Sequence, residues 1–122
     1  MLSLSASTQV YLALGATDMR KGFDGLSGLV TSQLRGDPLS GALFLFINRR
    51  RDRLKVLYWD GDGPAIWYRR LEEGTFRLPR AAADVSCVQM RSDEFTMLLR
   101  GIELTSVRRH KRYVLPTSVI AP

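Results

Sequence analysis

Four arginines stand within five positions of this chain, at Arg49, Arg50, Arg51 and Arg53. A guanidinium group presents a planar fork of N–H donors that suits phosphate, carboxylate and the guanine edge, whereas a lysine acts as a point charge. One or two charges would keep a turn solvated, but four so close repel each other unless an anion lies nearby. We therefore predict that these arginines contact an anionic partner, either the phosphates or a groove of DNA or an acidic protein surface.

Other basic residues extend this predicted contact surface along the chain. They are Lys55, Arg69, Arg70, Arg108, Arg109, Lys111 and Arg112. Over the 122 residues, 18 lysines and arginines outweigh 12 aspartates and glutamates, which gives a formal net charge of +6. Such a balance favours nucleic acid as a partner, although a genome rich in G and C also raises arginine use for no structural reason.

Carboxylates offer the main alternative chemistry. Asp18, Asp24, Asp60 and Asp62 would suit a metal-dependent nuclease if the fold brought them together. A simpler interpretation has Asp18 capping the first helix and Asp24 in its first turn. Asp60 and Asp62 also begin a calcium-loop pattern, but the pattern fails further on, and a glycine-rich turn between strands explains them better. We expect no catalytic residue and no metal site.

Other reactive side chains are few. His110 is the only histidine, and its basic neighbours disfavour its protonation, while no second imidazole or thiol accompanies it to bind zinc. Cys87 is the only cysteine and is interpreted as a buried small apolar residue. No Gly-Lys-Ser/Thr follows a glycine-rich loop, so nucleotide hydrolysis is not expected. The sequence predicts no cofactor.

The arginine cluster lies between apolar runs that we expect to pair as strands. Residues 43–47 are apolar on both faces, which is typical of a strand covered on both sides. Residues 54–60 and 65–71 follow, separated by a turn rich in glycine. These three segments should form consecutive antiparallel strands, with the arginines at the first turn. The aromatic residues Tyr58, Trp59, Trp67 and Tyr68 are interpreted as packing within this sheet rather than as stacking platforms for unpaired bases.

The flanking segments complete the predicted elements. Alternation over residues 9–14 predicts a first strand, and apolar residues at helical spacing predict an amphipathic helix over residues 23–35. Residues 75–78 are expected to add a short strand, and residues 85–90 a last one. Ser92, Asp93 and Glu94 indicate the N-cap and acidic first turn of a second helix, which Gly101 should end.

Together these elements predict an α+β fold in a single domain over residues 1–104. Its predominantly antiparallel sheet should have about five to six strands, with two main helices packed on it. Residues 105–122 are expected to form a basic, partly ordered C-terminal tail. No apolar run reaches the length of about 20 residues that spans a bilayer, and the N-terminus lacks the pattern of a signal peptide. We expect a cytoplasmic protein with no membrane contact.

One run of residues carries a resemblance to a known family. The run after the first strand consists of Thr17, Asp18, Met19, Arg20, Lys21, Gly22, Phe23, Asp24 and Gly25. It resembles the opening signature of the TnpB-type accessory proteins, which are encoded by the second open reading frame of bacterial insertion-sequence family sixty-six. The similarity continues through residues 44–46, 53–55, 58–61, 70–72 and 97–102, and so covers roughly residues 8–104.

This resemblance implies a non-catalytic accessory protein of DNA transposition in a mobile element. It implies as partners a separate transposase of the DDE type and another accessory protein of the element, and it provides no catalytic residues to carry over. Two hypotheses follow for the basic surface. In the first, the basic hairpin and tail contact DNA. In the alternative, the chain docks on the transposase without binding DNA itself. A third and less favoured interpretation is a metal-dependent nuclease.

Overall fold

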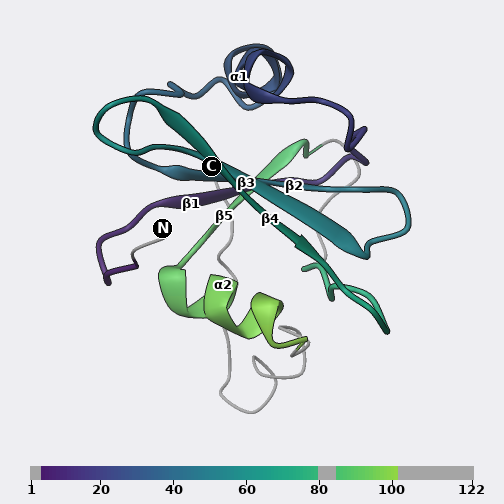
Figure 1. Cartoon of the computed structure of the whole chain (residues 1–122). Helices are drawn as coiled ribbons and strands as arrows, with labels where there is room; N and C mark the ends of the chain where they lie inside the picture. Colours follow the sequence, from purple (N-terminus) through teal and green to yellow (C-terminus); the bar gives the residue numbers. More distant parts are fainter. Residues whose placement is uncertain (1–3, 80–84, 102–122) are drawn as a thin grey trace.

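A five-stranded sheet with one helix on each face forms the described part of this chain, residues 4–79 and 85–101 of the computed structural model (Figure 1). The elements in chain order are β1 (Val10–Ala13), α1 (Phe23–Ser32), β2 (Leu43–Ile47), β3 (Arg53–Trp59), β4 (Pro64–Arg70), β5 (Cys87–Met90) and α2 (Ser92–Leu99). The strand order is β4-β3-β2-β1-β5. The predicted α+β class and the predominantly antiparallel sheet are confirmed.

The pairing of strands β2, β3 and β4 agrees with the prediction of three consecutive antiparallel strands. Strand β1 instead lies beside β2 in parallel, and its other neighbour, β5, is antiparallel. Two parallel strands need a long crossover between them, because the chain must return to the same end of the sheet. The segment that contains α1 provides this crossover. The sequence patterns did not predict this parallel pair.

Strand β2 is the middle strand, and all five of its residues are buried. Leu45 lies in an apolar cluster with Phe95 and Leu98 of α2. Phe46, on the opposite face, lies in a second cluster with Leu26 and Val30 of α1. Successive side chains of a strand point to opposite faces. The expectation that this strand is covered on both sides is therefore confirmed.

The ends of several elements differ from the predicted ones. Helix α1 ends at Ser32, not near residue 35, and Arg35 has a left-handed backbone with a φ of 55°. Asp18 does not cap this helix: Gly22 is the N-cap, and the Asp18 carboxylate pairs with Arg20 instead. Asp24 does lie in the first turn, as expected.

The N-cap of the second helix lies one residue earlier than predicted. Arg91 is the N-cap residue of α2, and its backbone N–H donates to the Glu94 carboxylate at 2.9 Å. The prediction of an N-cap at Ser92 was therefore wrong, because Ser92 is already the first helical residue. Gly101 follows the C-cap with a φ of 77°, which fits the predicted terminating glycine.

Residues 75–78 do not form the predicted short strand. Phe76 is buried in the cluster beneath α2, and its backbone N–H donates to the Arg51 carbonyl oxygen at 2.7 Å. The burial of Phe76 holds this segment against the sheet without ladder pairing. In the described part of the chain, no helix is long and apolar enough to cross a membrane.

Candidate nucleic-acid interface

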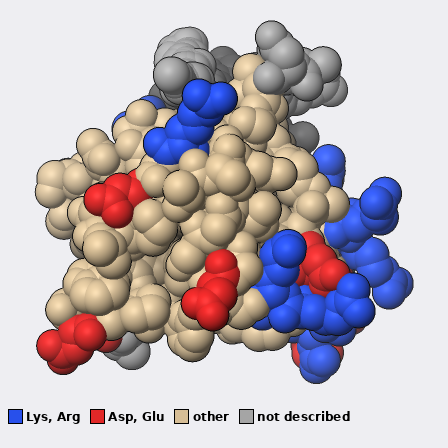
Figure 2. All heavy atoms as spheres, turned by 90° about the horizontal axis from the view of Figure 1, so that it is seen from above, with Lys and Arg blue, Asp and Glu red and all other residues tan. Residues whose placement is uncertain are grey.

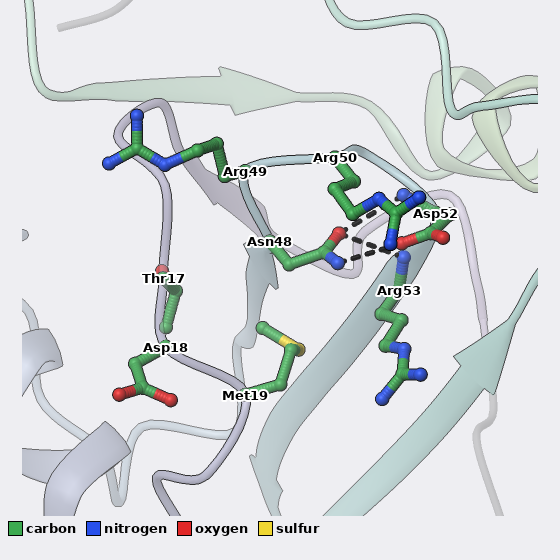
Figure 3. A pocket seen from close by; sticks show the side chains of 8 residues that line it. All are labelled: Thr17, Asp18, Met19, Asn48, Arg49, Arg50, Asp52 and Arg53. Carbon is green, nitrogen blue, oxygen red and sulfur yellow. Dashed lines mark hydrogen bonds between the residues drawn. The ribbon is translucent and has the colours of Figure 1, made fainter.

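Four arginines lie at the connection between β2 and β3, which we call the arginine turn: Arg49, Arg50, Arg51 and Arg53. Arg49, Arg50 and Arg51 are exposed, and Arg53 is half-buried at the start of β3. A cleft of about 320 Å³ lies beside this turn (Figure 3). It is lined by Thr17, Asp18, Met19, Asn48, Arg49, Arg50, Asp52 and Arg53. The fold thus places the start of the family-like signature against the arginine turn.

The backbone of the arginine turn is held by side-chain hydrogen bonds from within it. The Asn48 Oδ1 atom accepts from the backbone N–H groups of Asp52 and Arg53, each at 3.0 Å (Figure 3). The Asn48 Nδ2 atom donates to Asp52 Oδ1 at 2.7 Å. Neither residue was a predicted site residue, although asparagine and aspartate at turns commonly bond nearby backbone in this way.

The far side of the turn is held by the chain that follows β4. The Arg51 carbonyl oxygen accepts from Phe76 N–H at 2.7 Å, and the Asp52 carbonyl oxygen accepts from Leu71 N–H at 2.8 Å. Arg51 itself has a φ of 62°, in the left-handed region that is unfavourable for residues with a Cβ atom. The sequence of the turn thus keeps an arginine where the backbone alone would favour glycine.

Replacing Arg51 by glycine is expected to raise the free energy of unfolding by up to about 1 kcal/mol, because glycine adopts this conformation without a steric cost. Chemical denaturation would measure the change. Arg35→Gly is the matched control, since Arg35 is also exposed and has a φ of 55°. Both variants should gain stability, and a loss of several kcal/mol in Arg51→Gly alone would contradict the interpretation of its backbone.

The first part of the signature segment, which spans residues 17–25, is hydrogen-bonded to the sheet beside the turn. Thr17 is buried, and its backbone N–H donates to the Ile47 carbonyl oxygen at 2.9 Å, at the end of β2. The Lys55 ammonium group donates to the carbonyl oxygens of Met19 and Lys21 at 2.8 and 2.9 Å. Lys55 was predicted to contact the anionic partner, and in the structure two of its three donors bind this segment.

The arginines differ in whether a carboxylate pairs with them. Arg70 forms a salt bridge with Glu72 at 3.0 Å. Arg53 donates to the Tyr68 hydroxyl at 3.4 Å. Among the described residues, no salt bridge within 4.0 Å involves Arg49, Arg50 or Arg51. From the α1 side, the densest group of basic side chains lies at the lower right, on the side of the β2–β3 turn (Figure 2).

The pair Arg69 and Arg70 is divided between the two faces of the sheet. Arg70 lies opposite Arg53 in the β3–β4 register, whereas Arg69 lies opposite Leu54 of the cluster beneath α2. Cross-strand partners share a face. Arg70 therefore lies on the α1 face with Arg53, and Arg69 lies on the α2 face, where its guanidinium group stacks 4.9 Å from the Trp67 ring centroid.

The strand aromatics are engaged in packing to different extents. Tyr58 is buried, and Trp67 packs against the cluster beneath α2. Tyr68 is 47% exposed, but the Lys55 ammonium group lies 5.0 Å from its ring centroid. Trp59 is half-buried. The interpretation of these residues as packing is confirmed for Tyr58 and Trp67.

Within residues 4–79 and 85–101, no group of three or more histidine, cysteine, aspartate or glutamate side chains could hold a metal ion. Hydrogen bonds from the Arg20 guanidinium group lower the pKa of Asp18 to about 2. The hydrogen bond from Asn48 lowers the pKa of Asp52, and the charges of Arg50 and Arg53 add to this. Both carboxylates in the cleft thus accept hydrogen bonds from nearby side chains, Asp18 from Arg20 and Asp52 from Asn48.

Cys87 and the basic residues near the C-terminus complete the predicted features of the sequence. Cys87 is half-buried rather than fully buried, and burial raises the pKa of its thiol. The basic residues predicted to extend the contact surface beyond residue 101 lie outside the described residues. They are Arg108, Arg109, Lys111 and Arg112.

Comparison with known proteins gives a consistent result. The IS66 Orf2 like protein family matches residues 8–109. The chain is 36% identical over 119 residues to "Uncharacterized protein y4jC" of Sinorhizobium fredii (strain NBRC 101917 / NGR234), which covers 98% of this chain and 99% of that protein. It is 36% identical over 103 residues to "Uncharacterized protein y4hO" of the same strain, covering 84% of this chain and 88% of that protein.

No solved structure matches the chain. The family match extends over all of the elements described above, from β1 through α2, and it includes both the signature segment and the arginine turn. The resemblance noted in the sequence is therefore confirmed. The chain belongs to the IS66 Orf2 like protein family.

Proposed function

We propose that this chain, which as a family member has an accessory role in the transposition of an insertion element, performs that role by contacting DNA through the arginine turn. The observation that carries the proposal is the exposure of Arg49, Arg50 and Arg51 and the lack of a described carboxylate paired with them. These side chains are exposed and have no salt bridge to a described carboxylate, yet they project from a backbone that hydrogen bonds hold in place. Exposed guanidinium groups on an ordered backbone suit phosphate oxygens.

The form of DNA that fits this surface is the duplex. Single-stranded DNA is commonly bound by aromatic rings on which the bases stack. Here Tyr58 is buried, Trp67 lies against the core with Arg69 over it, and the Tyr68 ring has Lys55 beside it. Stacking a base on the face of Tyr68 that Lys55 covers would require moving Lys55, whose ammonium group is bound to Met19 and Lys21. Contacts to the phosphates of a duplex need no such rearrangement.

The proposal predicts binding to duplex DNA that weakens steeply with salt. If about six phosphates are contacted, the logarithm of the association constant should fall against the logarithm of salt concentration with a slope of about −5. Fluorescence anisotropy with a labelled duplex, measured from about 50 to 200 mM salt, would give the slope. Binding that is absent, or that does not change with salt, would overturn the proposal.

A further inference from the structure

The arginine side chains beside the cleft do not converge on one point. The guanidinium groups of Arg49, Arg50 and Arg53 point in different directions, while Asn48 and Asp52 lie between them and are joined by hydrogen bonds (Figure 3). This arrangement does not enclose a single anion. It suits several phosphates spaced along a DNA backbone, provided that the turn keeps its shape.

The carboxylate of Asp52 needs an explanation at such a surface. A turn that attracted phosphate by charge alone would gain from having no carboxylate beside Arg50 and Arg53, since the negative group repels the ligand. Asp52 Oδ1 instead accepts a hydrogen bond from Asn48 Nδ2 at 2.7 Å. Asn48 Oδ1 in turn accepts hydrogen bonds from the backbone N–H groups of Asp52 and Arg53. The two side chains thus fix the backbone from which the arginines project.

We infer that Asn48 and Asp52 are positioning residues for the DNA contact, an inference that rests on the proposed function. Neither needs to touch DNA. Their hydrogen bonds hold the backbone from which the four arginines project in one conformation before binding, so that less backbone freedom is lost when the phosphates are contacted. Phosphate contacts set the salt dependence of binding, whereas this prior ordering changes the affinity without changing the number of contacts.

Three proteins with the same formal charge test this inference. They are the wild type, Asn48→Ala, and the exchange Asn48→Asp with Asp52→Asn. In the exchanged protein, the carboxylate at position 48 can accept the same two N–H groups, and the amide at position 52 can donate to it. We expect Asn48→Ala to bind duplex DNA about three- to tenfold more weakly at constant salt, with an unchanged salt slope. The exchange should recover most of this loss.

Two controls separate positioning from general stability. Val30→Ala creates a cavity beneath α1, away from the turn, and lowers the melting temperature without lowering the affinity for DNA. Amide hydrogen exchange should be faster at Asp52 and Arg53 in Asn48→Ala, and slow again in the exchanged protein. If Asn48→Ala does not fold, Asn48→Ser replaces it and is compared with the same exchanged protein.

The outcomes distinguish failure of this inference from failure of the proposed function. If the wild type binds DNA but Asn48→Ala binds equally well, or if the exchange is as weak as Asn48→Ala, then the positioning role is overturned while the DNA contact stands. A smaller salt slope in Asn48→Ala would also overturn it, because that result means a lost phosphate contact. If the wild type does not bind duplex DNA, the function and the inference both fail.

Discussion

Replacing both Arg50 and Arg51 by glutamate is expected to lower the affinity for duplex DNA by about 60-fold or more at 0.1 M salt. Each lost phosphate contact removes about 0.9 from the salt slope, so two lost contacts change the association constant by about 10 to the power 1.8 at this salt concentration. The new carboxylates also repel phosphate. Both side chains are exposed at the turn, so their exchange removes no buried contact. Anisotropy titrations at several salt concentrations would measure both the affinity and the slope.

The control for this variant is Arg35→Glu, which makes the same charge change per residue at the other end of β2. Arg35 precedes Gly36, whose backbone lies against the Phe44 ring near the start of that strand. Its exchange should weaken binding only slightly. If Arg35→Glu weakens binding as much as each of the two substitutions at the turn does, the contact depends on overall charge and the arginine turn has no special role.

Co-purification with the transposase of the element, measured separately, distinguishes the second hypothesis. If the double glutamate variant keeps its affinity for DNA but no longer co-purifies with the transposase, the arginine turn docks on protein and the DNA proposal is wrong. Acidic patches on a partner protein would bind the same guanidinium groups. Loss of DNA binding with co-purification retained supports the proposal.

Replacing Phe46 by alanine is expected to lower the free energy of unfolding by about 3–5 kcal/mol. Phe46 is fully buried on the middle strand, in the cluster beneath α1 with Leu26 and Val30. The substitution removes a large apolar side chain from the hydrophobic core and leaves a cavity that the surrounding structure fills only in part. Since a domain of this kind has a total stability of about 5–15 kcal/mol, a large part of it would be lost. Urea denaturation followed by circular dichroism measures the change.

The matched control for Phe46 is Phe23→Ala. Phe23 is the first residue of α1 and is 48% exposed, so the same change in composition removes far less buried area. Its cost should stay below about 1.5 kcal/mol, about half of the smallest cost expected for the buried ring. Equal losses in the two variants would mean that the cluster beneath α1 is not packed as described.

The parts of the fold that followed from the sequence are those decided by local pattern. The apolar run of β2 and the alternation of β1 and β3 identify strands because burial on one or both faces leaves a period in the residues. The position of β1 could not be predicted in this way. Its parallel pairing with β2 depends on how the crossover through α1 returns the chain, and no residue in β1 encodes its neighbour.

The candidate site was predicted only in part, for a similar reason. The arginines were visible because their types and density are unusual. The roles of Asn48 and Asp52 were not, because a lone asparagine and aspartate are common in turns and only their geometry joins them. Arg69 and Arg70 were both expected to extend the contact surface, and the period of two in a strand already places neighbouring residues on opposite faces, as the register confirms. Asp18 was assigned to the wrong partner, since a nearby guanidinium group competes with a helix N-terminus for a carboxylate.

The attachment of the signature segment to the sheet has a mechanical consequence. Thr17 is bonded to the end of β2, and Lys55 of β3 is bonded to Met19 and Lys21, which lead directly into α1. The arginine turn lies between these same two strands. Few covalent and hydrogen bonds therefore separate the arginine turn from the first turn of α1, and they include the backbone carbonyl groups of Met19 and Lys21. The hydrogen bonds of Lys55 therefore join the sheet beside the arginine turn to the segment that begins α1.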